Sequence, residues 1–394
     1  MTAPRIGIIG ADVPRQLVLA AGATPVRLTG AWSGEVSREA GELLGAADVV
    51  AARILDSVLS GAHGGRDGRE AKSGLAGLVV CNDSMAHLRV FYVLRVLAGR
   101  GRLGFPVHLL DTPRGGGPHR TRFVARQYER LAGFVSGCTG TRLDSASLAE
   151  AAARETLVGQ ALERVRERRR ARTLSGTAAL RCYAAAATTT PEEAVDSIEA
   201  VLDERRAAPD AALADAVPVF MTGSSHPDPT VYAALEQAGI LVVGEDHDAG
   251  DAAWIGEAVE SGEVPPAEAQ SDLSPSQRRG SGHFAPEAGG GLGGVFRALA
   301  ERHALRPPAA ARSLADERSR HLLAEVHRTG AAGVVALVRD LDDGPAWDLA
   351  DHREALAGSG TWLAGVVQIP ADGVRDATAE LLSSIQQHSG RTAP

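Results

Sequence analysis

Short apolar runs alternate with amphipathic segments along the first part of the chain. Runs typical of buried strands cover residues 5–9, 24–28, 75–80 and 107–110. Apolar residues at helical spacing cover 13–22, 39–59 and 84–97, with Pro14 and Gly22 suited to the start and end of the first of these helices. Strands that alternate with helices of this length predict a parallel sheet covered by helices on both faces.

The same alternation returns near the end of the chain. Strand-like runs cover 217–222, 240–243, 332–338 and 362–369, with helical segments over 230–238 and 349–357. Residues 122–135 and 145–174 also have a helical pattern, and Thr190 is a suitable N-cap for a further helix. The sequence therefore predicts an α/β fold with two Rossmann-like domains, whose parallel sheets are joined by a helical segment.

The domain boundaries are placed where this pattern changes. We predict an N-terminal α/β domain over residues 1–140, a helical connector over 141–210 and a C-terminal α/β domain over 211–394. Residues 264–294 are rich in serine, glycine, proline and glutamine, which predicts a mobile loop within the last domain.

Composition excludes several classes of protein. The net charge of -8 argues against nucleic-acid binding, and the arginines of segment 161–172 alternate with glutamates, as on a solvated helix face. No apolar run reaches the roughly 18 residues of a membrane helix, and the first residues do not resemble a signal peptide. The three cysteines are widely spaced and form no disulfide framework. We expect a cytoplasmic protein that binds neither nucleic acid nor membranes.

Polar residues follow the third predicted strand directly. Cys81, Asn82, Asp83 and Ser84 come after the apolar run 75–80. Because open α/β sheets bind ligands at the carboxyl ends of their strands, these side chains are candidates for chemistry. Cys81 has three open interpretations: a metal ligand, a nucleophile or a small buried side chain.

Three other segments carry candidate binding groups. Residues 223–226 (Gly-Ser-Ser-His) lead from a strand into a helix, where backbone amides can hold an anion, or where serine simply caps an ordinary turn. Residues 245–248 (Glu-Asp-His-Asp) either bind a divalent cation, serve acid–base chemistry or form an exposed polar loop. Arg114, Arg120 and Arg122 flank a glycine turn and either grip phosphates or lie on the surface.

Four groups of short motifs occur in order along the chain. They are VPRQ at 13–16 with AAGATPVRL at 20–28; DSM at 83–85 with Leu88; TGSS at 222–225 with Asp228-Pro229 and VVGED at 242–246; and GVV at 333–335 with WD at 347–348 and VQI at 367–369. In this order they resemble the 2-hydroxyacyl-CoA dehydratase and benzoyl-CoA reductase family, and within it the 2-hydroxyglutaryl-CoA dehydratase D-component. The resemblance extends over nearly the whole chain.

The resemblance implies an assembly and a chemistry. It implies two Rossmann-like domains per subunit and a homodimer or a heterodimer with a related subunit. Active members hold a [4Fe-4S] cluster on three cysteines, and an ATP-dependent activator delivers one electron. The acyl thioester then becomes a ketyl radical anion that expels hydroxide.

The chain departs from this pattern at the cluster ligands. The segment that resembles the first ligand position, 49–53, has no cysteine, and Asp342 stands at the third. At the second, either Cys81 or Asn82 aligns with the family's cysteine. One thiolate and one carboxylate form a poor site for a cubane cluster. A [4Fe-4S] cluster is therefore not the favoured expectation, and no other cofactor is expected. Cys81 and Asp342 are the candidate ligands if a cluster is bound.

The favoured hypothesis is a cluster-poor or cluster-free relative that binds an acyl thioester such as an acyl-CoA, or a related carboxylate, between its domains. We lean towards an enzyme, a dehydratase-like lyase. Two alternatives stay open: a true [4Fe-4S] dehydratase subunit that uses Cys81, and a non-catalytic partner of a cysteine-complete paralogue. The candidate catalytic residues are Cys81, Asp83 and His226, and the candidate substrate-binding residues are Asp12, Arg27, Ser84, Gly223, Ser224, Ser225 and Asp246.

Overall fold

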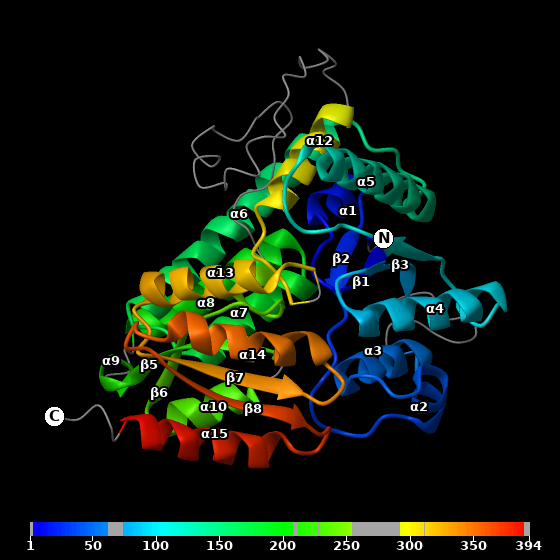
Figure 1. The fold of residues 1–394 in the computed structure, drawn as a ribbon. Coiled ribbons are helices and arrows are strands. Elements are labelled where there is room, and N and C mark those ends of the chain that lie inside the picture. Colours follow the sequence, from blue (N-terminus) through cyan, green and yellow to red (C-terminus); the bar gives the residue numbers. More distant parts are fainter. Residues whose placement is uncertain are drawn as a thin grey trace. The chain divides into compact units, whose positions relative to one another are not determined.

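A computed structural model describes residues 3–61, 74–207, 212–226, 229–253, 292–310 and 312–389 (Figure 1). Most of the predicted mobile loop at 264–294 lies outside these residues, as does Asp228. Residues 292–294, its last part, belong to helix α12 (Leu292–Ala304). No helix in the described part of the chain combines the length and the apolar character needed to cross a membrane.

The chain forms two compact units, each assembled from three separate segments. Unit 1 contains Met1–Arg27, His63–Gly159 and Ile255–Arg306, and unit 2 contains Leu28–Ala62, Gln160–Trp254 and Pro307–Pro394. The predicted domain boundaries at residues 140 and 210 stay a prediction.

The sheet of unit 1 has four parallel strands in the order β2-β1-β3-β4. They are β1 (Arg5–Ile9), β2 (Thr24–Arg27), β3 (Leu75–Cys81) and β4 (Val107–Leu110). Each begins and ends within one residue of its predicted range, because the apolar runs that form the buried sheet are short and sharply bounded.

Helices cover both faces of this sheet (Figure 1). The apolar side chains of α1 (Arg15–Ala20), α5 (Pro118–Thr139) and α12 form one core with β1 and β3. Helix α4 (Met85–Gly99) lies on the other face, and Ser84 caps it by accepting a hydrogen bond from the His87 amide at 3.1 Å.

The sheet of unit 2 repeats this topology, in the order β6-β5-β7-β8. Its parallel strands are β5 (Val217–Gly223), β6 (Ile240–Glu245), β7 (Gly333–Arg339) and β8 (Trp362–Ile369). Two such sheets, each with helices on both faces, confirm the predicted α/β class with two Rossmann-like domains.

Two sets of helices sandwich the sheet of unit 2 (Figure 1). Helices α10 (Thr230–Gln237) and α15 (Val374–Ser389) pack on one face, with α7 (Gly176–Thr188) in the same core. Helices α13 (Ala315–Thr329) and α14 (Asp343–Leu356) pack on the other. The other described elements are α2 (Arg38–Leu44), α3 (Val49–Leu59), α6 (Ser145–Arg170), α8 (Pro191–Ala207), α9 (Ala212–Asp215) and the short 3₁₀ helix η1 (Asp251–Ala253).

The predicted continuous helix over 39–59 is wrong. Gly45, at a φ of 67°, ends α2, and Asp48 begins α3 by accepting a hydrogen bond from the Val50 amide at 3.3 Å. Apolar spacing alone continues through this break, whereas glycine in the left-handed region is a common helix stop. The helix predicted to reach residue 174 ends at Arg170, and the helix predicted from 349 begins at Asp343.

Each sheet has a switch point, where successive connections leave the sheet in opposite directions. It lies between β1 and β3 in unit 1 and between β5 and β7 in unit 2. Gly10 and Gly223 turn the chain there, at φ values of 95° and 108°. A Cβ on Gly10 would lie 2.3 Å from Asp83 Oδ2, and one on Gly223 2.6 Å from the Leu337 carbonyl, so both turns require glycine. Open α/β sheets bind ligands beside such switch points.

Candidate functional site

The predicted site residues of unit 1 meet at its switch point. Asp83 Oδ2 accepts a hydrogen bond from the Ala11 amide at 3.2 Å, and Asp83 Oδ1 lies 2.6 Å from Nδ1 of His87. Asp83 thus joins the loop after β1 to the beginning of α4. Ser84, predicted to bind substrate, has its hydroxyl engaged as the cap of α4.

Cys81 is fully buried at the end of β3. Burial raises the pKa of its thiol well above the usual value, and the nearby carboxylates of Asp83 and Asp12 raise it further. The positive charge of Arg27 acts in the opposite direction but is outweighed. Cys81 is therefore a neutral thiol at pH 7, which favours the small buried side chain among its three interpretations.

Asp12 is the centre of a buried polar cluster. Its carboxylate accepts hydrogen bonds from Arg114 Nη2 at 2.6 Å and from the Thr112 hydroxyl at 3.2 Å, and Arg306 Nε lies 3.6 Å away. Burial alone would raise the pKa of Asp12, but Arg114, Arg306 and then His303 hold it below its usual value. Asp12, Thr112, Arg114, His303 and Arg306 are called the Asp12 cluster below.

Positive charge exceeds negative charge in the Asp12 cluster. Burial lowers the pKa of His303 to about 4, so this side chain is neutral at pH 7, and its Nε2 lies 3.1 Å from the Thr112 carbonyl. Arginine stays protonated in proteins, so two guanidinium groups face one carboxylate. Nε and Nη1 of Arg114 are buried without a hydrogen-bond partner among the described residues. The cluster can therefore accommodate a further anion.

The predicted residues that follow β5 form a second junction, in unit 2. The Ser224 hydroxyl donates to Asp342 Oδ2 at 2.6 Å and accepts from the Arg339 amide at 3.0 Å. The Ser225 carbonyl accepts a hydrogen bond from the Arg339 guanidinium. Burial raises the pKa of Asp342. The Ser224 hydroxyl and the Ser225 carbonyl thus contact β7 and its following loop.

Arg339 connects this junction to the segment before α3. Its Nε and Nη2 donate to the two carboxylate oxygens of Asp48 at 2.8 and 2.9 Å, and its guanidinium lies 5.5 Å from the ring centre of Trp32. Arg339, Asp48 and Trp32 are all buried. Nothing in the sequence indicates this pair, because its partners are 291 positions apart.

Asp246, predicted to bind substrate, lies just after β6. The Thr222 hydroxyl donates to its Oδ2 at 2.8 Å. Burial raises the pKa of Asp246 to about 7, although the hydrogen bond from Thr222 acts in the opposite direction. Its carboxyl group thus changes protonation near neutral pH, as acid–base catalysis requires.

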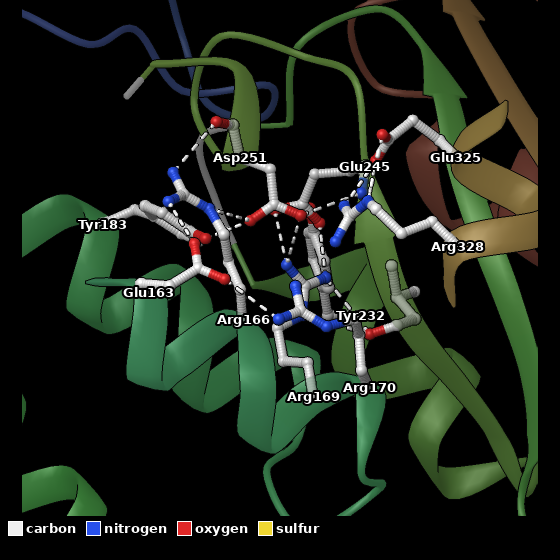
Figure 2. Close-up of polar contacts among 11 residues, drawn as sticks. Glu163, Arg166, Arg169, Arg170, Tyr183, Tyr232, Glu245, Asp251, Glu325 and Arg328 are labelled. Carbon is white, nitrogen blue, oxygen red and sulfur yellow. Dashed lines mark hydrogen bonds and ion pairs between the residues drawn. The ribbon is translucent and has the colours of Figure 1, made fainter. Parts of the chain in front are cut away.

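A network of buried charges surrounds the neighbouring residue, Glu245 (Figure 2). Arg169 donates to both carboxylate oxygens of Glu245, at 3.0 and 2.7 Å, and lies 3.3 Å from Asp251. Tyr183 donates to Asp251 as well. Arg169 has an exposed fraction of 0% and Arg166 is also buried, so the interpretation of segment 161–172 as a solvated face is wrong at these two residues. No local signal distinguishes Arg169 from the half-buried Arg168 and Arg170 beside it.

Two histidines lie at the edge of this network. The hydroxyl of Tyr232 is 2.9 Å from Glu245 Oε2 and 2.7 Å from His247 Nε2. The ring of His247 is 5.2 Å from that of His226, centre to centre, at an angle of 73°. His226 and His247 were both singled out in the sequence, and the structure brings them together.

The donor set does not fit a [4Fe-4S] cluster held by three cysteines of this chain. Cys138 lies against Gly77, since a Cβ there would be 2.7 Å from its Sγ. Cys81 is four residues farther along β3, roughly 13 Å away. Cys182 belongs to α7 in unit 2. Within the described ranges, no group of three or more histidine, cysteine or acidic side chains is arranged to hold a metal ion.

The sequence matches a protein-family model. The family model described as 2-hydroxyglutaryl-CoA dehydratase, D-component, matches residues 11–269, which is more than half of the chain. None of the curated proteins matches the chain.

Proposed function

Because the chain belongs to the 2-hydroxyglutaryl-CoA dehydratase D-component family, we propose that it binds an acyl thioester, or a related carboxylate, at the Asp12 cluster. Family membership supports a 2-hydroxyacyl-CoA dehydratase-like protein. The donor set supports a form that carries no [4Fe-4S] cluster on its own cysteines, so no electron-transfer step is assigned to this chain.

The excess of positive charge in the Asp12 cluster carries this proposal. Two buried guanidinium groups face one carboxylate, and Arg114 has two buried N–H groups to offer. An arginine fork matches the geometry of a carboxylate or phosphate better than a lysine does. The cluster lies at the carboxyl ends of the strands, beside a switch point, where α/β sheets bind their ligands.

The family is named for one component of an enzyme, which supports an assembly of more than one chain. We propose a second copy or a related subunit as the partner, with an ATP-dependent activator acting on the assembly. Light scattering of the purified chain, alone and mixed with a cysteine-complete homologue, measures this directly.

Calorimetric titration tests the ligand. We expect butyryl-CoA to bind saturably to the full chain. Arg114→Gln should weaken binding about tenfold or more, because a hydrogen bond to a charged group contributes about 1.5–3 kcal/mol. Arg114→Lys keeps the charge but loses the fork, so its affinity for butyryl-CoA should lie between those of the wild type and Arg114→Gln. Arg297→Gln, at an exposed position of α12, is the matched control and should bind as the wild type does.

Two results would overturn the proposal. If the folded wild type bound none of butyryl-CoA, coenzyme A and butyrate, the proposed acyl thioester or carboxylate ligand would be ruled out. Tight association with a cysteine-complete homologue would then favour the non-catalytic partner. Stoichiometric iron and sulfide in anaerobically purified protein would instead favour a true [4Fe-4S] subunit that uses Cys81.

A further inference from the structure

His226 is a buried histidine whose ring makes no hydrogen bond to the described residues. Its exposed fraction is 1%, and neither ring nitrogen has a hydrogen-bond partner in the described part of the chain. It follows Ser224 and Ser225 in the loop after β5, at the switch point of unit 2. Buried polar groups are normally paired, so an unpaired imidazole at the ligand-binding edge of a sheet indicates a missing partner.

The hydrogen bonds of Tyr232 determine the tautomer of its neighbour His247. Arg169 donates to both oxygens of Glu245, so that carboxylate can only accept, and the single hydroxyl proton of Tyr232 is directed to it. The Tyr232 oxygen must then accept from His247, at 2.7 Å. Nε2 of His247 therefore carries the proton, and Nδ1 has a free lone pair.

Nδ1 of His247 is also buried without a partner among the described residues. Burial lowers the pKa of both histidines, so both rings are neutral at pH 7. Together, the two rings offer one N–H donor, from His226, and two acceptor lone pairs, one on each ring. A hydroxyl group complements this set, because it donates one hydrogen bond and accepts another.

The surrounding charges favour a neutral ligand over an anion. The guanidinium of Arg339 is engaged by Asp48, and that of Arg169 by Glu245 and Asp251. Unlike in the Asp12 cluster, the described charges around the two histidines include no excess of positive charge. Trp32, whose ring centre lies 4.9 Å from that of His226, adds an apolar surface.

We propose that His226 and His247 form a binding site in unit 2 for a neutral ligand that carries a hydroxyl group. The site shares no residue with the Asp12 cluster, so this proposal does not depend on acyl thioester binding there.

Lactamide and propionamide are suitable probes, because both are neutral and they differ only in one hydroxyl group. The full chain, labelled with ¹⁵N-histidine, is titrated with each. We expect the spectrum to show His247 with its proton on Nε2. Lactamide should shift the signals of His226 and His247 saturably, and propionamide should bind at least about tenfold more weakly, as expected for the loss of a buried hydrogen bond.

A matched variant locates the site. His226→Gln should abolish the lactamide-dependent shift of His247. His352→Gln, at another buried histidine of the same unit, should leave it unchanged. Equal binding of the two amides by the wild type would overturn the proposal without any variant. A lactamide response that persists in folded His226→Gln, or a His247 proton on Nδ1, would overturn it as well.

Discussion

Arg169 donates to both carboxylate oxygens of Glu245, and neither side chain has more than 1% exposure. The two residues are 76 positions apart, on α6 and at the end of β6. Removing Glu245 would leave the buried Arg169 with Asp251 as its remaining acidic partner among the described residues, so its charge would be compensated only in part. The pair therefore connects the long helix to the sheet of unit 2 and makes the fold sensitive to either residue.

Glu245→Gln should lower the free energy of unfolding by up to about 3 kcal/mol, because Arg169 loses the closer of its two buried counter-charges and keeps only Asp251, at 3.3 Å. Urea denaturation measures the change. The exposed pair Arg164–Glu199 supplies the control on the same helix, and Glu199→Gln should cost less than about 1 kcal/mol. Equal losses for the two variants would show that the buried pair has no special weight.

Asp246 should make the protein less stable as the pH rises from about 4 to about 7. Its pKa is about 7 in the folded state and near 3.8 when unperturbed, so the folded state binds the extra proton within this window. The free energy of unfolding of Asp246→Asn, relative to that of the wild type, should therefore rise by about 2 kcal/mol between pH 5 and pH 8. Denaturation curves of both proteins at the two pH values check this; a stability difference that does not change with pH would contradict it.

His303 should act in the opposite direction. Its pKa is about 4 in the folded state, below the usual 6.5, so the unfolded state binds more protons between these values. Stability should then fall as the pH falls from 6.5 towards 4. Relative to His303→Gln, the wild type should lose about 2 kcal/mol between pH 7 and pH 4.5. Urea denaturation of the two proteins at both pH values measures this. A difference in their free energies of unfolding that is the same at pH 7 and pH 4.5 would refute it.

Gly10→Ala should destabilise the protein by about 2 kcal/mol or more. The added Cβ meets Asp83 and Cys81, and φ at this residue is 95°. Gly133→Ala is the control, since this exposed glycine lies within α5 and a Cβ there meets nothing within 4 Å. It should stabilise the helix by about 0.5–1 kcal/mol. Melting curves distinguish the two, and a tolerated Gly10→Ala would show that the turn can rearrange.

Cys81 should resist alkylation in the native protein. It is fully buried and its pKa is raised, whereas Cys138 is partly exposed. Because the thiolate is the reactive form, iodoacetamide should modify Cys138 first and Cys81 only after unfolding. Mass spectrometry of timed samples gives the order. Rapid native labelling of Cys81 would restore the nucleophile interpretation.

The fold was predictable where the sequence is locally decisive. The strands at 107–110 and 362–369 were predicted to the residue, because short apolar runs between polar loops have few alternatives. Asp12 and Asp83 lie after the carboxyl ends of β1 and β3, where the strand pattern placed them. His226 and His247 follow the neighbouring parallel strands β5 and β6, so they lie at the same edge of the sheet.

The partners of these residues could not be predicted in the same way. Arg306 and Arg169 lie in segments that contain other arginines, and only the distant carboxylates of Asp12 and Glu245 distinguish them. Helix periodicity likewise passes through Gly45 without a sign of the break. Pairing over long separations depends on topology, which a local pattern does not contain.

The order of the segments has a consequence for biosynthesis. The Asp12 cluster needs His303 and Arg306, which are translated almost 300 residues after Asp12 itself. Unit 1 therefore cannot acquire its charged centre while the first half of the chain emerges from the ribosome. A fragment cut after residue 159 would leave the Asp12 carboxylate without one of its two arginines, so expression of the first half alone should yield an incompletely folded product.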